Sequence, residues 1–125
     1  MSGTVPGSSL SRPEGLPFVE VNNIYDKIPT RLPDEFTEVL AGSPAVRIER
    51  IISWGQASPG GFWYDQEGHE WVLLLKGKAV LQFREPDETL VLEPGAWINI
   101  AAHRKHRVEW TDISGETVWL AVHYT

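Results

Sequence analysis

The sequence predicts an all-β domain, a barrel or sandwich, preceded by one short helix. From Val46 onward, short segments rich in apolar and β-branched residues follow one another at strand length. Turn signals such as Lys76-Gly77 and Ser114-Gly115 separate these segments, and no helical pattern lies between them. The chain has 125 residues, a length that favours one domain with a core of its own.

Three segments precede the predicted barrel. Residues 1–17 are rich in Gly, Ser and Pro, which is typical of a flexible arm. Phe18 to Ile24 is apolar enough for a short strand. A short helix is predicted from Pro33 to Ala41, because Pro33 suits a first helical turn and the acidic residues after it favour the positive end of the helix dipole. Residues 18–45 would thus hold a strand and a helix, and 46–125 the barrel.

Within the barrel, the pattern predicts strands at 46–52, 70–76, 78–84, 89–92, 96–100, 106–111 and 117–124. The first alternates between polar and apolar residues before it turns apolar. The second contains the unbroken apolar run Trp-Val-Leu-Leu-Leu, which is typical of a strand buried on both faces. Short strands at this spacing indicate a sandwich or a barrel.

Composition restricts the possible partners and compartment. The net charge of −6 argues against nucleic acid as the main partner. The chain has no Cys, which excludes disulfides and thiolate metal sites. No segment approaches the roughly 20 apolar residues that span a bilayer, and the first residues lack the apolar core of a signal peptide. We therefore expect a cytoplasmic protein without a membrane partner.

Polar residues gather where two of the predicted strands begin. Tyr64, Gln66 and Glu70 share one strand parity if no bulge intervenes, and His106 begins a later strand whose face continues with Val108 and Trp110. If the two segments are neighbours, Gln66, Glu70 and His106 meet inside the barrel mouth. A buried Glu and His need partners. A divalent metal and a direct Glu–His hydrogen bond are the two alternatives.

The spacing of these residues resembles the motifs of the small single-domain cupins, whose fold is a double-stranded β-helix of the jelly-roll kind. Glu70 and Gly77 have the spacing that ends the first cupin motif. Pro94-Gly95 opens the second motif, and His106 falls on the His of that motif. Several stretches of the chain also resemble a subgroup of bacterial cupins of unassigned chemistry.

The resemblance covers roughly residues 46–124 and weakens at the site. Tyr64 and Gln66 stand where the first motif places its two His residues. His103 stands in place of the motif Gly, where a His can still adopt a positive φ. The usual set of three His and one Glu is therefore not present as such.

The resemblance implies a divalent metal (Fe, Mn, Ni or Zn) and a small organic ligand in the barrel mouth. The expected metal ligands are Glu70, His106 and Gln66. The expected ligand pocket comprises Tyr64, Asp65, His69, Trp63, Trp71, His103 and Trp110. Cupins include dioxygenases, isomerases and hydrolases, so the fold alone does not choose a reaction. The alternative is a non-catalytic cupin that binds a small ligand at a degenerate or absent metal site.

Two further expectations concern residues outside this set. His123 is interpreted as structural, and Trp54, Trp97 and Trp119 as ordinary packing residues. The apolar segment from Phe18 to Ile24 has no evident role in the core, and an open sheet edge is a liability unless it is covered. Because resembling proteins pack such an arm on a partner subunit, we expect a homodimer.

Overall fold

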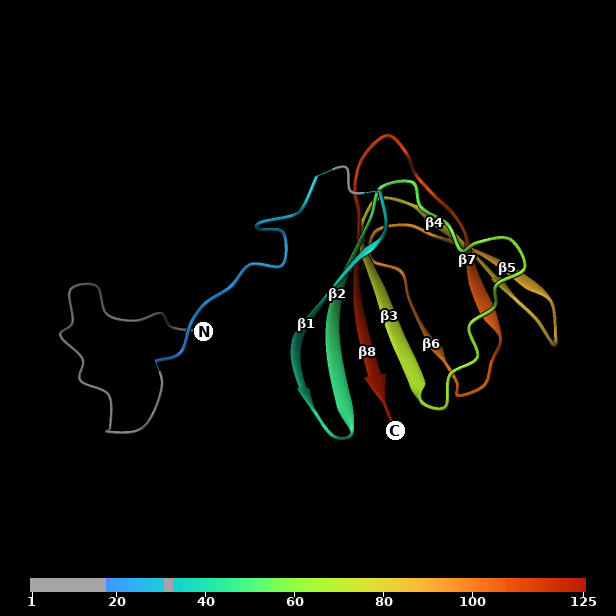
Figure 1. Ribbon diagram of the computed structural model, residues 1–125, viewed down its shortest axis with the longest axis horizontal. Coiled ribbons are helices and arrows are strands. Elements are labelled where there is room, and N and C mark those ends of the chain that lie inside the picture. Colours follow the sequence, from blue (N-terminus) through green and yellow to red (C-terminus); the bar gives the residue numbers. More distant parts are fainter. Residues whose placement is uncertain (1–17, 31–32) are drawn as a thin grey trace.

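Two antiparallel sheets face each other in the computed structural model, which describes residues 18–30 and 33–125 (Figure 1). The larger sheet has the strand order β1 (Phe36–Ser43), β2 (Val46–Ser53), β8 (Thr117–Tyr124), β3 (His69–Lys76) and β6 (Trp97–Ile100). The smaller sheet has the order β5 (Glu88–Leu92), β4 (Ala79–Phe83) and β7 (His106–Thr111). The predicted all-β jelly roll is confirmed, and so are all seven strands predicted within the barrel.

The hydrophobic core lies between the inner faces of the two sheets. Alternate residues of β3 and β4 enter it, as the period of a strand requires. The buried cluster comprises Val72, Leu74, Ala79, Leu81, Phe83, Leu92, Ile100, Trp119 and Ala121. Four of its members, Val72, Leu81, Ile100 and Trp119, also line the cavity described below.

The helix predicted over residues 33–41 is wrong, and no helix occurs among the described residues. The segment forms β1 instead, which pairs antiparallel with β2 from Phe36↔Ile52 to Ser43↔Val46 across a two-residue turn. Phe, Thr and Val in this segment favour a strand, and pairing with β2 outweighs the weak local helix signals. The barrel therefore begins with β1, ten residues before the predicted start at Val46.

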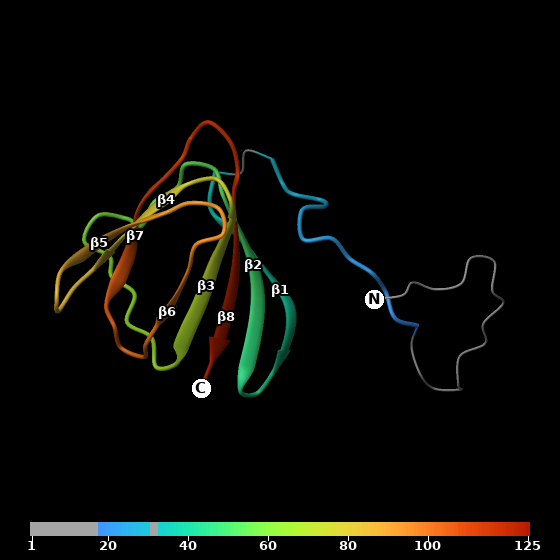
Figure 2. The same ribbon diagram turned by 180° about the vertical axis from the view of Figure 1, so that it is seen from behind.

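The strand predicted from Phe18 to Ile24 is also absent; these residues have no regular structure or enter a turn. Arg50 satisfies the backbone of the turn in place of a strand partner. This arginine is 5% exposed, and its guanidinium donates to the carbonyls of Ile24 (3.0 Å) and Asp26 (2.6 Å). Viewed from behind, residues 18–30 lie on the β1 side of the barrel, and the first of them lie farthest from it (Figure 2).

The predicted flexible arm, residues 1–17, lies outside the described residues. Within the described part of the chain, no helix has the length and apolarity needed to cross a membrane.

Candidate functional site

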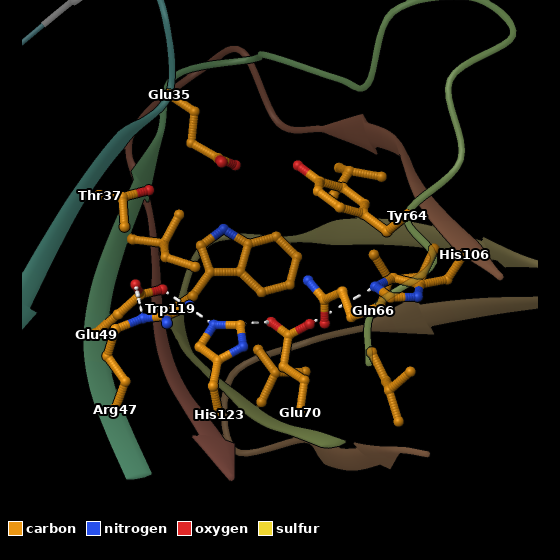
Figure 3. Close-up of a pocket in the computed structure, with 15 residues that line it drawn as sticks. Glu35, Thr37, Arg47, Glu49, Tyr64, Gln66, Glu70, His106, Trp119 and His123 are labelled. Atoms are coloured by element: carbon orange, nitrogen blue, oxygen red, sulfur yellow. Dashed lines mark hydrogen bonds and ion pairs between the residues drawn. The ribbon is translucent and has the colours of Figure 1, made fainter. Parts of the chain in front are cut away.

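A cavity of about 210 Å³ lies between the two sheets at the polar end of the barrel. Figure 3 shows its lining, which comes from every strand except β5, from the loop before β3 and from Glu35 just before β1. We call it the barrel cavity, and its lining residues are Glu35, Thr37, Arg47, Glu49, Ile51, Tyr64, Gln66, Glu70, Val72, Leu81, Ile100, His106, Val108, Trp119 and His123. Apolar side chains thus form its floor and polar side chains its mouth.

His106 is fixed on one side of the barrel cavity. Its ring stacks between Tyr64 (centroids 5.3 Å apart) and Phe83 (5.8 Å), and the residue is 5% exposed. Nδ1 lies 2.9 Å from the carbonyl oxygen of Arg104. Because a carbonyl only accepts, Nδ1 carries the proton and donates it. The other nitrogen, Nε2, is directed toward the cavity and Glu70.

Glu70 lies at the centre of the polar mouth, between two imidazoles. In the sheet it is directly opposite Ile100 of β6 and His123 of β8, which brings the His123 side chain near it. Its carboxylate oxygens lie 3.6 Å from His106 Nε2 and 3.9 Å from His123 Nε2. Both distances exceed that of a hydrogen bond. The Glu70 carboxylate therefore faces the cavity with acceptor capacity unused.

Glu49, by contrast, is fully engaged on the opposite wall. Its carboxylate accepts from Arg47 Nε at 2.6 Å and from His123 Nε2 at 3.0 Å. His123 therefore links the two carboxylates, and a continuous row runs from Glu49 through His123 and Glu70 to His106 (Figure 3).

Glu35 stands at the rim of the cavity, just before β1. The indole Nε1 of Trp119 donates to the Ser53 hydroxyl (3.1 Å), which lies 3.3 Å from a carboxylate oxygen of Glu35. Burial of the carboxyl raises the pKa of Glu35; the hydrogen bond from Ser53 opposes this shift, and the charges of Glu70 and Glu49 add to it. The cavity thus disfavours negative charge at this position.

Tyr64 faces Glu35 across the cavity (Figure 3). Burial raises the pKa of the Tyr64 phenol, and the negative charges of Glu35 and Glu70 raise it further. The backbone of Tyr64 pairs with that of His106 at 2.7 and 3.2 Å, so the loop before β3 covers the edge of β7. This pairing explains why Tyr64 and His106 lie side by side.

Four of the residues predicted from the sequence meet in the barrel cavity. Glu70, His106 and Gln66, the expected metal ligands, all line it, as does Tyr64. The backbone pairing of the loop with β7 and the position of Glu70 at the start of β3 bring them together.

The other six predicted pocket residues lie outside the cavity lining. Trp71 follows Glu70 and points to the opposite face of the sheet, where its ring lies 5.8 Å from that of Trp97. Trp110 is turned outward by a bulge, because Val80 pairs with Trp110 while Leu81 pairs with Val108.

The remaining four residues have local partners. Trp63 lies beneath the guanidinium of Arg84, 5.0 Å from its ring centroid. Asp65 pairs with His103 at 2.8 Å, and His69 Nδ1 accepts from the backbone N–H of Ala102 at 2.9 Å. His103 adopts φ 62°, the positive value expected of a residue in the place of the motif Gly.

Sequence reasoning did not place four important residues in the site: Glu35, Glu49, Trp119 and His123. His123 and Trp119 share one parity of β8, and Glu49 lies on the matching face of β2, opposite Ala121. This alternation is visible in the sequence. The pairing of β2 with β8 and of β8 with β3, which joins these faces, is not.

The donor types in the mouth suit a divalent metal, but their arrangement does not. Two imidazoles and a carboxylate are the donors of many non-haem iron sites. Here, however, Glu70 lies between the imidazoles, and His123 Nε2 already donates to Glu49. Among the described residues, no three His, Cys, Asp or Glu side chains are placed to hold one ion. The side chains as placed therefore do not form a metal centre.

The strand order and the two facing antiparallel sheets are those of a jelly-roll barrel, here with an apolar floor and a polar mouth. A protein from Ralstonia eutropha JMP134, provisionally named a mannose-6-phosphate isomerase, is 44% identical, with a TM-score of 0.81 over 84% of this chain and 97% of that one. A cupin superfamily protein from Desulfitobacterium hafniense DCB-2 is 23% identical, with a TM-score of 0.65 over 78% and 83%. The chain belongs to the cupin superfamily, as the motif spacing indicated.

A more distant solved structure shares the fold alone. It is the Fe(II) form of HppE with an alternative substrate, (S)-1-HPP, at 15% identity and a TM-score of 0.61 over 78% of this chain and 53% of that one. No family model matches the sequence. No curated protein matches it either.

Proposed function

We propose that the barrel cavity binds a small organic molecule that carries at least one hydroxyl group. The observation that supports this most directly is the gap between Glu70 and His106. The carboxylate oxygen and Nε2 lie 3.6 Å apart, each faces the cavity, and neither makes a hydrogen bond to the other. A ligand hydroxyl in this gap donates its one proton to Glu70 and, where Nε2 of His106 also carries a proton, accepts from Nε2.

The rest of the cavity matches this ligand. Trp119 offers an apolar ring beside the floor residues Ile51 and Val108, on which a carbon skeleton can rest. The volume of about 210 Å³ is below the roughly 300–1,000 Å³ of pockets for drug-sized ligands. The ligand is therefore small.

The negative charges of the cavity disfavour binding of a phosphorylated sugar. The name of the Ralstonia relative refers to such a ligand. Glu35, Glu49 and Glu70 line the cavity. Among the described residues, Arg47 is the one Lys or Arg in the lining, and its guanidinium is held by Glu49 at 2.6 Å. A phosphate would therefore meet like charges without a cation to pair with.

A metal-dependent cupin enzyme is the second candidate. The observation that favours it is the donor set of Glu70, His106 and His123, with Gln66 nearby in the lining. A bound metal would supply a Lewis acid and open positions for substrate or oxygen. Elemental analysis of protein purified without a metal-binding tag tests it: one equivalent of a transition metal, lost in His106→Ala, would favour this candidate.

Ligand binding is tested by screening small hydroxyl-bearing fragments against metal-stripped protein by two-dimensional NMR. We expect hits to shift the indole signal of Trp119 and the backbone signals of Tyr64 and His106. Val108→Phe, which fills the floor, should abolish these shifts. Val91→Phe is the matched control, because Val91 is 57% exposed on β5 and lies away from the lining.

The role of the gap between Glu70 and His106 is tested by Glu70→Gln, which keeps the shape of the side chain and removes its negative charge. We expect the affinity of a hydroxyl-bearing hit to fall by about tenfold or more, because a hydrogen bond to a charged group contributes about 1.5–3 kcal/mol. Hits that bind Val108→Phe or Glu70→Gln as well as they bind the wild type would refute the proposed site.

A further inference from the structure

Three carboxylates face the barrel cavity, and they are not equivalent. Glu49 accepts from Arg47 and His123 and is fully paired. The carboxylate of Glu70 makes no hydrogen bond, and the carboxylate of Glu35 accepts only from the hydroxyl of Ser53, at 3.3 Å. Two carboxylates are thus turned toward the cavity, and neither has a Lys or Arg partner among the described residues that line it.

Glu35 is anchored beside aromatic rings. Ser53, which is 0% exposed, links its carboxylate to the indole N–H of Trp119 through contacts of 3.1 and 3.3 Å. From the opposite wall the Tyr64 ring is directed toward the same place (Figure 3). A carboxylate on the wall of a cavity that an aromatic ring also lines is an arrangement that recognises ammonium groups, because the face of such a ring attracts cations.

A second feature of the cavity, independent of the carboxylates, indicates a ligand. His106 is 5% exposed, yet its Nε2 faces the cavity and has no hydrogen bond. Because Nε2 opens to the cavity, water or a polar group of a ligand can complete its hydrogen bonding. Nε2 therefore marks where the polar end of a ligand lies, on the same side as Glu70.

We propose that the barrel cavity selects a small organic cation, with its ammonium group between Glu35, Tyr64 and Trp119 and its hydroxyl group between Glu70 and His106. This inference rests on the proposed function, a site for a small hydroxyl-bearing molecule, and specifies in addition that the ligand is positively charged. The raised pKa values of Glu35 and Tyr64 are consistent with it, because both follow from burial in a cavity of negative potential. A bound cation reverses that potential.

Three probes of one shape and different charge test this inference: choline, its uncharged carbon isostere neohexanol, and the carboxylate tert-butylacetate. Affinities are measured by calorimetry on metal-stripped protein, and the Trp119 indole signal locates each probe. We expect choline to bind about tenfold more tightly than neohexanol, as one partly buried charge pair allows, and tert-butylacetate to bind most weakly.

Glu35→Gln should remove most of the preference for choline and leave the affinity for neohexanol unchanged. Glu67→Gln is the matched control, since Glu67 is exposed in the loop before β3 and does not line the cavity; it should keep the preference. The inference is overturned if choline fails to bind, if neohexanol or tert-butylacetate binds as tightly, or if Glu35→Gln keeps the preference. Equal binding of choline and neohexanol would still leave the proposed ligand site intact.

Discussion

At the scale of single residues, the site depends on which polar groups are paired and which are not. Glu49 and His123 are hydrogen-bonded to each other, and they build the wall. Glu70 and His106 Nε2 are near each other but not bonded, and they face the cavity. Function is expected where polar groups open to the cavity without a partner, because water or a ligand can complete their hydrogen bonds there.

Glu35 gives a test of this view through stability. The folded protein holds the proton of Glu35 to a higher pH than the unfolded chain, in which the pKa is near 4.5. Raising the pH through the raised pKa therefore lowers the free energy of unfolding. Glu35→Gln removes this loss, so the variant should be more stable than the wild type near pH 7, by less than about 1 kcal/mol because the residue is partly exposed.

Urea denaturation at two pH values measures the effect. Below the ordinary pKa of a Glu, both folded and unfolded wild type carry the proton, so the difference from Glu35→Gln should vanish. Glu67→Gln should show no comparable pattern. Equal stability of Glu35→Gln and the wild type near pH 7 would mean that the cavity does not disfavour this charge.

At the scale of elements, the turns were predictable and the pairing was not. The glycines and prolines between the strands fixed where each strand ends, so all seven barrel strands were found. The face of β2 that lines the cavity was harder to predict from the sequence. Its more apolar face, with Ile48 and Ile52, points away from the cavity. Arg47 and Glu49 point into it. In a barrel with a polar mouth, the rule that apolar residues face inward fails at the mouth itself.

The helix predicted over 33–41 failed for a related reason. Pro33 and the acidic residues after it are local signals, and they were outweighed by seven residue pairs between β1 and β2. His123 was likewise missed because its role depends on its two neighbours in the sheet, Arg47 and Glu70. The motif positions Glu70 and His106 could be found from sequence, since spacing along the chain defines them.

Two turn glycines provide a matched test of element geometry. Gly77 and Gly95 have nearly the same φ, 92° and 94°. A Cβ on Gly77 would lie 2.7 Å from the Cα of Thr117, whereas a Cβ on Gly95 would meet nothing within 4 Å. Both Ala variants incur the strain of a positive φ, about 1–3 kcal/mol, and only Gly77→Ala adds a backbone clash.

We therefore expect Gly77→Ala to lower the free energy of unfolding by clearly more than Gly95→Ala, by about 2 kcal/mol or more beyond the shared strain. Denaturant unfolding of the two variants measures the difference. Equal losses would indicate that the turn after β3 relaxes freely and does not constrain the position of the strand that carries Glu70.

At the scale of the whole molecule, apolar side chains are left uncovered on one side of the barrel. Val19 and Val21 of the N-terminal segment are 96% and 92% exposed. Arg50 fastens the turn that follows them to the sheet. On β1, an edge strand, Val39 and Leu40 are exposed as well. Exposed apolar segments beside an open sheet edge are typical of interaction surfaces.

We propose that this side forms the interface of a homodimer. Sedimentation at tens of micromolar should show a dimer, and the double substitution Val19→Asp and Val21→Asp should shift it toward monomer. Val91→Asp on β5 is the control, because Val91 is also exposed but lies on the other sheet. A wild-type monomer at this concentration would contradict the proposal.

The most direct test of the central claim is a crystal structure of the protein with its tightest-binding hydroxyl-bearing fragment. The account predicts electron density for the fragment inside the barrel cavity, in contact with Trp119, with a hydroxyl oxygen within hydrogen-bond distance of both Glu70 and His106 Nε2. A fragment bound elsewhere on the molecule, with the gap between Glu70 and His106 unchanged, would contradict it.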